Sequence, residues 1–347
     1  MFHIYLVAFL ICFSKIESSD EIGESFEDIV CPRNELLKPC YCDPYVASIQ
    51  CDIPNTTVCD LSAITSKVAN LTTKANVVFS EIAIEDVALH ELSQFDLGNL
   101  LYKRVAILNS GLRYIHPLAF GRTAETVTYI DLEANRLTDD VFEALRCLPS
   151  LEYVSLSNNY LKVIPSHAFR RTNGQFQSRL KGILLTGNRI HTISDHTFFY
   201  LPHLTTLHIN MNQISRINVS AFEFEDIPIG RKTNLYIDLS MNLLQADSFD
   251  AKGLQNINRP VKLSLNRNKV THLNQSVFEP FLNKHVNNSV DVKDNPLICN
   301  CSSYWIHEKR SVFAVKIKNH FCVDNRDLFD YYETEFSKCD VDFNLQL

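Results

Sequence analysis

Four copies of one pattern, L-x-x-L-x-L-x-x-N-x-L with other aliphatic residues allowed, follow one another in the chain: VTYIDLEANRL (127–137), LEYVSLSNNYL (151–161), LKGILLTGNRI (180–190) and LTTLHINMNQI (204–214). Three more copies follow, NLYIDLSMNLL from Asn234, PVKLSLNRNKV from Pro260 and NNSVDVKDNPL from Asn287. Two weaker copies precede them, FSEIAIEDVAL from Phe79 and YKRVAILNSGL from Tyr102. The nine copies begin 23 to 30 residues apart, so we expect a stack of repeated coils.

Each copy predicts a short strand followed by a turn. Apolar positions 4 and 6, such as Ile130 and Leu132, are expected to be buried, while positions 3, 5 and 7 face outward. A phenylalanine on the return path is expected to stack in the core: Phe120, Phe142, Phe169, Phe198, Phe222, Phe249 and Phe278. Position 9 holds an asparagine expected to bond the backbone of the turn and of the next coil: Asn135, Asn159, Asn188, Asn212, Asn242, Asn268 and Asn295.

The composition limits the class of protein. The chain has 347 residues, of which 46% are hydrophobic and 21% charged, with a net charge of −7. This balance excludes general disorder and argues against a nucleic-acid binder. Only 9 Gly and 12 Pro exclude a collagen-like or low-complexity chain.

The first residues predict export. The unbroken apolar run over residues 4–13 is typical of a secretory signal peptide, which we place at 1–18, with a flexible segment at 19–30. A retained anchor or a buried strand is the alternative. No later stretch is long and apolar enough to span a bilayer, so we expect an extracellular, secreted protein with no membrane span. Candidate glycosylation sites are Asn55, Asn70, Asn218, Asn274, Asn287 and Asn300.

Cysteines cluster on both sides of the repeats, where a stack of coils needs caps to cover its core. Cys31, Cys40, Cys42 and Cys51 precede the first coil, and Cys299, Cys301, Cys322 and Cys339 follow the last. Disulfides are expected in an exported chain, with zinc as the alternative. Cys59 and Cys147 are left over, and they either pair, stay as buried thiols or bond another chain.

With these features the chain resembles extracellular leucine-rich-repeat proteins with cysteine-rich caps, over about residues 31–340. The resemblance implies an α/β solenoid, a horseshoe of about nine repeats with a parallel sheet on its concave side. It divides the chain into an N-terminal cap at 31–78, repeats at 79–297, a C-terminal cap at 298–340 and a tail at 341–347. It also implies disulfides that pair Cys31 with Cys42, Cys40 with Cys51, Cys299 with Cys322 and Cys301 with Cys339.

A narrower resemblance rests on the front cap CPRNELLKPCYC and the degenerate first coils. These are similar to arthropod secreted proteins akin to the non-catalytic leucine-rich-repeat subunit of shrimp luciferase. That similarity implies an accessory subunit of a secreted oxidoreductase, without an active site of its own.

The search for reactive groups favours a protein that is not an enzyme and that needs no cofactor or metal. No G-x-S-x-G, H-E-x-x-H, P-loop or G-x-G-x-x-G motif occurs. The histidine-rich stretch is the best metal candidate, but the repeat places its members apart: His191, His196, His203 and His208, with Asp195. Asp139 and Asp140 are expected to be solvated turn residues. Lys262, Arg267 and Lys269 suit a contact with a sulfated glycan or an ordinary charged surface.

The concave sheet is the candidate binding surface, because its outward residues are not needed to hold a coil together. Tyrosines beside carboxylates can bury aromatic area and place hydrogen bonds, as protein interfaces do. Cross-strand pairs that only cover a sheet are the alternative. The candidate residues are Tyr129, Asp131, Tyr153, Ser155, His208, Met211, Tyr236 and Asp238. We therefore hypothesise a secreted recognition module whose partner is an extracellular protein, such as a receptor, a matrix component or an enzyme subunit.

Overall fold

The computed structural model describes residues 29–52, 60–72, 76–171, 179–226 and 233–331, together with residues 336 and 339. The chain divides into two compact units. Unit 1 comprises Met1–Lys162 and Ala168–Leu185, and unit 2 comprises Val163–His167 and Thr186–Leu347. The predictions for the signal peptide, for Asn55 and Cys59 and for the tail lie outside the described residues.

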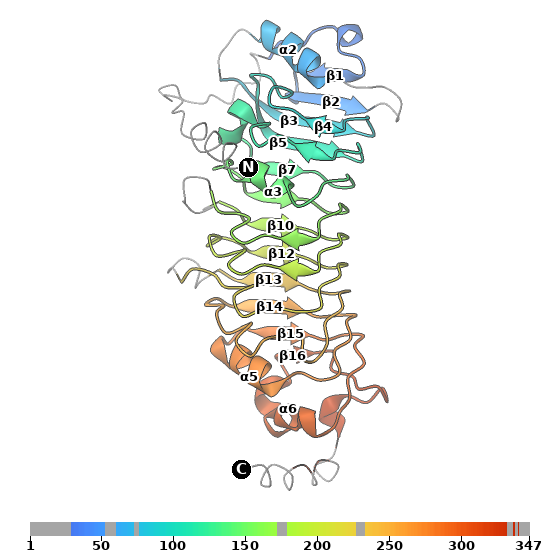
Figure 1. Cartoon of the computed structure of the whole chain (residues 1–347), viewed down its shortest axis with the longest axis vertical. Helices are drawn as coiled ribbons and strands as arrows, with labels where there is room; N and C mark the ends of the chain where they lie inside the picture. The colour runs from blue at the N-terminus through green and yellow to red at the C-terminus, as the bar shows by residue number, and fades with distance from the viewer. Residues whose placement is uncertain are drawn as a thin grey trace. The chain divides into compact units, whose positions relative to one another are not determined.

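Unit 1 is built on a sheet in which β1 and β2 are antiparallel and every later neighbour is parallel. Figure 1 shows its strands one after another along the stack. In order across the sheet they are β1 (Cys40–Asp43), β2 (Ser48–Asp52), β3 (Val78–Glu85), β5 (Leu101–Leu108), β7 (Tyr129–Asp131), β8 (Tyr153–Ser155) and β10 (Gly182–Leu184). The short strands β4 (Glu91–Leu92) and β6 (Tyr114–Ile115) pair separately.

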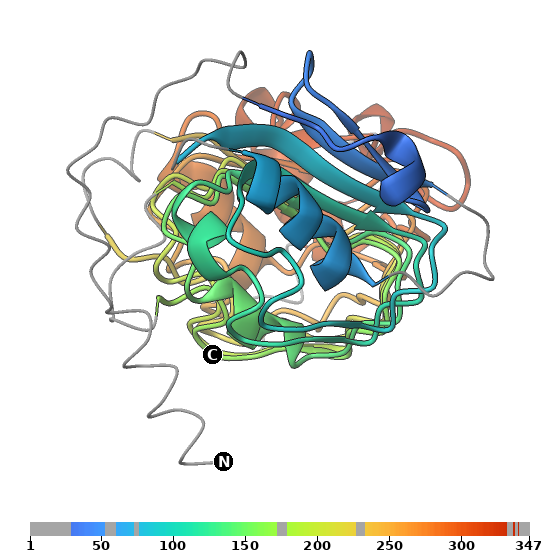
Figure 2. The ribbon, with the colours of Figure 1, turned by 90° about the horizontal axis from the view of Figure 1, so that it is seen from above.

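Helices of unit 1 lie in the cap and on the return paths. The N-terminal cap contains η2 (Asn34–Leu36) and α2 (Leu61–Leu71), and the return paths contain η3 (Gly121–Glu125) and α3 (Val141–Leu145). Asp60 starts α2 by accepting a hydrogen bond from the Ala63 N–H at 2.9 Å. In the view from above, α2 crosses the end of the coil (Figure 2). Its residues Leu61, Ile64 and Val68 are buried.

Unit 2 continues the same plan with parallel strands. They are β12 (Thr206–His208), β13 (Leu235–Asp238), β14 (Val261–Ser264), β15 (Ser289–Asp291) and β16 (Ile317–Lys318), with β9 (Val163–Ile164) and β11 (Thr192–Ile193) paired apart. Its helices are α5 (Gln275–Lys284), η4 (Cys301–Ser303), α6 (Tyr304–Glu308), α7 (Arg310–Phe313) and η5 (Leu328–Asp330). Among the described residues, none of these helices has the length and apolar character needed to cross a bilayer.

Each strand of the large sheet from β3 to β15 includes residues of one repeat copy, and the core follows from the pattern. Positions 4 and 6 are fully buried, as at Ile130 and Leu132 in unit 1 and at Leu207 and Ile209 in unit 2. The return-path phenylalanines are buried as well, and some touch, such as Phe198 and Phe222 with centroids 5.8 Å apart. Both units therefore have the leucine-rich-repeat fold, and this prediction is confirmed.

The asparagine rungs behave as expected except in direction. Asn159 accepts from the Leu137 N–H at 2.9 Å and donates to the carbonyls of Leu132 and Leu156. Leu132 and Leu137 belong to the preceding coil, so the expectation of a bond to the next coil was wrong. The Asn159 amide oxygen faces the N–H groups in the turn of the preceding coil, where Leu137 lies.

Position 8 of the repeat, one residue before the asparagine position, lies in the left-handed backbone region in every coil described, with φ between 45° and 70°. The residues are Asp86, Asn109, Ala134, Asn158, Gly187, Met211, Met241, Arg267 and Asp294. Gly, Asn and Asp tolerate this region most easily. Alanine, arginine and methionine at this place are therefore departures from local preference.

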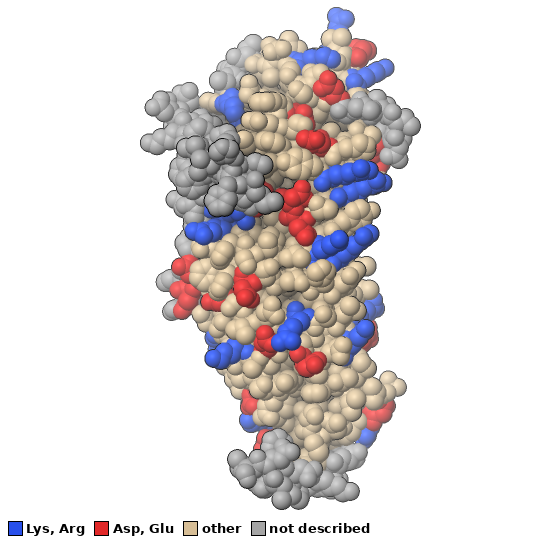
Figure 3. All heavy atoms as spheres, in the orientation of Figure 1, with Lys and Arg blue, Asp and Glu red and all other residues tan. Residues whose placement is uncertain are grey.

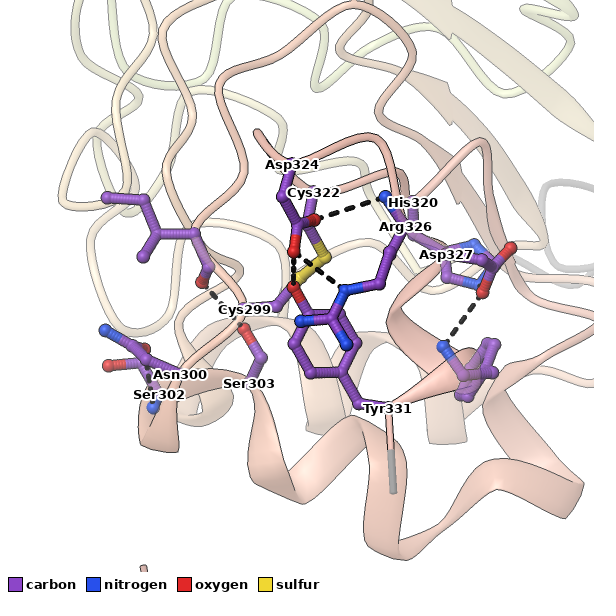
Figure 4. Close-up of a disulfide and its surroundings, with 12 residues drawn as sticks. Cys299, Asn300, Ser302, Ser303, His320, Cys322, Asp324, Arg326, Asp327 and Tyr331 are labelled. Carbon is purple, nitrogen blue, oxygen red and sulfur yellow. Dashed lines mark hydrogen bonds and ion pairs between the residues drawn. A yellow bond between two sulfur atoms is a disulfide. The ribbon is translucent and has the colours of Figure 1, made fainter. Parts of the chain in front are cut away.

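Disulfides close both ends. Unit 1 contains the bonds Cys31–Cys42 and Cys40–Cys51, and unit 2 contains Cys299–Cys322 and Cys301–Cys339. Figure 4 shows the Cys299–Cys322 bond beside a polar cluster, in which Asp324 accepts from the Arg326 Nε and the Tyr331 hydroxyl, each at 2.8 Å. Cys147 is also disulfide-bonded, which removes the buried-thiol alternative for that residue.

Candidate functional site

The predicted binding residues divide equally between the units. Unit 1 holds Tyr129, Asp131, Tyr153 and Ser155 on β7 and β8, and unit 2 holds His208, Tyr236 and Asp238 on β12 and β13 with Met211 in the turn after β12. Ser155 faces outward but is only 3% exposed. Its neighbours in the register are the larger Asp131 and Leu184, which cover it, so Ser155 does not belong to the accessible surface.

The unit 1 face, which we define as Glu81, Arg104, Tyr129, Asp131 and Tyr153, is built on a cation between two carboxylates. The Arg104 guanidinium lies 3.4 Å from Glu81 Oε2 and 3.4 Å from Asp131 Oδ2. Its Cζ atom is 5.0 Å from the centre of the Tyr129 ring, within range of a cation–π contact. The repeat pattern places Glu81 and Arg104 at position 3, as it does the two tyrosines, but only the tyrosines were predicted as binding residues.

The two tyrosines of this face stack. Their ring centres are 6.0 Å apart with an angle of 29° between the planes, and Tyr153 remains 40% exposed. Gly182 makes room for Tyr153, since a Cβ atom at that residue would lie 2.5 Å from the Tyr153 Cδ1 atom. Partial burial raises the pKa of the Tyr129 hydroxyl and Asp131 raises it further. At neutral pH the hydroxyl is therefore a neutral hydrogen-bond donor and acceptor.

The unit 2 face, defined as His208, Met211, Tyr236, Asp238 and Met241, is more apolar. The His208 ring packs edge-on against Tyr236 with centres 5.6 Å apart, and its Nδ1 lies 3.9 Å from Asp238 Oδ2. Burial raises the pKa of the Tyr236 hydroxyl, and Asp238 raises it further. The two methionines are 49% and 40% exposed, so two thioethers lie open to solvent at this edge.

The histidine-rich stretch is dispersed. His208 lies on the strand, His191 bonds the neighbouring Thr192 hydroxyl at 2.9 Å, and His196 stacks on His167 with centres 5.8 Å apart. Within the described residues no three metal-ligating side chains come together.

The basic and acidic residues singled out in the sequence do not form one site either. Lys262 lies on β14, whereas Arg267 lies in the turn after it and pairs with Asp294 at 3.2 Å. Asp139 accepts from the Lys162 N–H and Asp140 accepts from the Thr138 hydroxyl, as expected of turn residues. Acidic and basic side chains are interspersed over the view in Figure 3, so net charge does not select a partner there.

Comparisons with known proteins agree with this fold. A family model described as leucine rich repeat matches residues 178–224. The chain is 24% identical over 264 residues to Toll-like receptor 2 type-2 of Gallus gallus, covering 68% of this chain and 31% of that protein. It is 25% identical over 173 residues to keratocan of Danio rerio, covering 44% and 46%. The chain thus spans less than half the length of each of these relatives.

Two solved structures show the same fold. One is FLRT2 in an octameric complex with latrophilin 3 and Unc5D, with a TM-score of 0.56 at 17% identity over 86% of this chain and 99% of that chain. The other is the mouse RP105/MD-1 complex, with a TM-score of 0.51 at 18% identity over 82% of this chain and 57% of that chain. The chain therefore has the leucine-rich-repeat fold, with disulfide-rich caps.

Proposed function

We propose that the chain is a non-catalytic recognition module that binds a protein through the unit 1 and unit 2 faces. The observation that carries the proposal is the Tyr129 and Tyr153 stack, with Tyr153 40% exposed. Aromatic side chains with a polar tip are enriched in protein interfaces and at the residues that dominate their binding energy.

The unit 1 face is already ordered for binding. Arg104 is held between Glu81 and Asp131 and lies over Tyr129, and Gly182 leaves a seat for Tyr153. A partner that docks there immobilises few new side chains, which lowers the entropic cost of association. A surface that only covers the sheet would not need side chains held in fixed positions.

An extracellular location supports the proposal. Disulfides such as Cys31–Cys42 and Cys299–Cys322 form in oxidising compartments and are rare in the cytosol. Both structural relatives named above were determined in complexes that contain other proteins, which fits a protein partner. No contact in the described residues favours a role as an oxidoreductase subunit over binding to other protein partners.

The test is affinity capture from an extracellular extract of the source organism. The full chain is the bait, and it is compared with Tyr129→Ala and Tyr153→Ala. The matched control is Tyr160→Ala, because Tyr160 is also 40% exposed but lies past the turn, outside the strand. We expect one protein to be captured by the wild type and the control and to be lost with either face variant.

A second readout removes dependence on the extract. Once captured, the partner is titrated against the purified variants, and truncating one central tyrosine should weaken binding by at least tenfold, or about 1.4 kcal/mol. Equal affinities for Tyr153→Ala and Tyr160→Ala would refute the role assigned to the unit 1 face.

A further inference from the structure

A hollow of about 510 Å³ lies in the C-terminal cap of unit 2, between the start of α5 and the helix α6. Its lining includes Asn274, Gln275, Ser302, Tyr304, Trp305 and Glu308. The wall thus combines the half-buried Tyr304 and the edge of Trp305, which is 4% exposed, with amide, hydroxyl and carboxylate groups. Sugars are bound by such mixed surfaces, because their C–H faces pack on rings while their hydroxyls need polar partners.

Asn274 stands at the rim of this hollow and begins the sequence Asn-Gln-Ser, an acceptor for N-linked glycans. Its Oδ1 caps α5 by accepting from the Ser276 N–H at 3.1 Å and from the Ser276 hydroxyl at 2.9 Å. Within the described part of the chain, its Nδ2 donates to no hydrogen bond. The cap therefore occupies the oxygen and leaves the nitrogen for a sugar.

The rim beside Asn274 is held in place. Glu279 accepts from Gln275 at 2.8 Å and from the Lys309 Nζ at 2.5 Å, which ties α5 to the residue after α6. The Trp305 Nε1–H donates to the Leu273 carbonyl at 3.2 Å. Leu273 precedes Asn274 in the chain, so this hydrogen bond holds the indole close to the start of α5. The walls of the hollow are thus ordered before any sugar is present.

We propose that Asn274 carries an N-linked glycan whose first sugars lie in this hollow against Tyr304 and Trp305. The inference rests on the extracellular location in the proposed function. In the modification, a bond forms between Asn274 Nδ2 and the anomeric carbon of the first sugar. The bond from that carbon to the lipid pyrophosphate donor breaks, the pyrophosphate leaves with its electron pair, and Nδ2 loses one proton.

A neighbouring sequon provides the internal comparison. Asn300 also caps a short helix, accepting from the Ser302 N–H at 3.0 Å, and Figure 4 shows this pair beside the Cys299–Cys322 bond. Asn300 itself does not line the hollow, although Ser302 does. A glycan on Asn300 should therefore leave the environment of Trp305 unchanged.

The experiment uses the full chain secreted from animal cells, with two readouts. Peptide mass spectrometry after enzymatic deglycosylation in heavy-oxygen water reports which asparagines carried a glycan. Acrylamide quenching of fluorescence reports on the hollow alone, because Trp305 is the single tryptophan of the chain. We expect a glycan at Asn274, and deglycosylation should increase the quenching of Trp305 and lower the Tm by about 3 °C.

The controls separate the glycan from the helix cap. Asn274→Asp keeps an oxygen for the Ser276 N–H but accepts no sugar, so it should show the higher quenching before and after deglycosylation. Asn300→Asp should still show the increase. The proposal is overturned if Asn274 is unmodified, or if quenching is unchanged on deglycosylation or follows Asn300. Glycans on other sequons with none on Asn274 would refute this inference while leaving the proposed extracellular recognition role intact.

Discussion

Replacing Asn242 by alanine removes one rung of the asparagine ladder in unit 2. Its Oδ1 accepts from the Ile214 N–H at 3.0 Å, and its Nδ2 donates to the carbonyls of Ile209 and Leu239, each at 3.0 Å. The two carbonyls keep a second donor, since Asn212 also bonds Ile209 and Asn268 also bonds Leu239. Among the described residues the Ile214 N–H has no acceptor other than Asn242 Oδ1, so it becomes the orphaned group.

The expected loss of stability follows from the difference between the orphaned N–H and the two carbonyls that keep a donor. An unsatisfied buried N–H costs about 1–3 kcal/mol, and each hydrogen bond to a carbonyl that keeps another partner contributes about 0.5–1.5 kcal/mol. We therefore expect Asn242→Ala to lower the free energy of unfolding by about 3 kcal/mol. Asn295→Ala removes the same set of bonds at the last rung, but Asn295 is half-buried, so water can replace them. The expected loss there is about 1 kcal/mol.

The assay is urea unfolding of both variants, followed by far-UV circular dichroism without reductant so that the disulfides stay closed. Hydrogen exchange at the Ile214 amide gives a local readout, and it should accelerate in Asn242→Ala only. Equal losses for the two variants, or a loss below about 1 kcal/mol for Asn242→Ala, would refute the assignment of the cost to the orphaned N–H.

Four further predictions concern other parts of the chain. Gly182→Ala should displace the Tyr153 ring, because the new Cβ would lie 2.5 Å from its Cδ1 atom, and partner capture should fall as in Tyr153→Ala. The Asp324 carboxyl should titrate in NMR at a pKa of about 2, because Arg326 donates to it, and the pKa should rise in Arg326→Ala. Since the folded pKa is lowered, this contribution to stability is present above about pH 4 and is lost as the pH falls towards 2. Hydrogen peroxide should convert both methionines of the unit 2 face to sulfoxides and weaken partner binding, whereas a variant with leucine at both positions should be resistant. Met241→Asn should raise the free energy of unfolding in urea by about 0.5–1 kcal/mol, because asparagine tolerates the left-handed backbone better.

The repeat pattern alone predicts most of the scaffold. Strand positions, buried positions 4 and 6 and the asparagine rungs depend on contacts that recur in every coil, so nine copies report the same constraint. Side-chain accessibility was harder, because it depends on the residue in the adjacent coil. Ser155 and Tyr153 share a strand, yet one is 3% and the other 40% exposed. The exposure of such residues can be predicted by aligning the strands in register and comparing the sizes of cross-strand neighbours.

The candidate site was predicted in part for the same reason. The tyrosines were recognised as a type of residue, but their order depends on Arg104 and Gly182, which come from separate repeats. Neither is unusual alone. Their role appears only when the register brings Arg104 beside Tyr129 and Gly182 beside Tyr153. A sequence reading by column, position 3 in each successive repeat, gives this row directly.

The backbone conformation at position 8 bears on the role of the unit 2 face. Every described coil needs a left-handed residue there, and Asn158 and Gly187 supply it at low cost. Met211 and Met241 occupy the same conformation with flexible side chains that remain 49% and 40% exposed. These side chains bury little area, so their packing offsets little of the backbone strain. The asparagine and glycine of neighbouring coils fit this backbone conformation with less strain. Such a departure from local preference is expected where a residue is kept for recognition, and thioethers adapt to partners of varied shape. Ala134 and Arg267 show the same departure outside the unit 2 face, so position 8 supports that face only together with the solvent exposure of its two methionines.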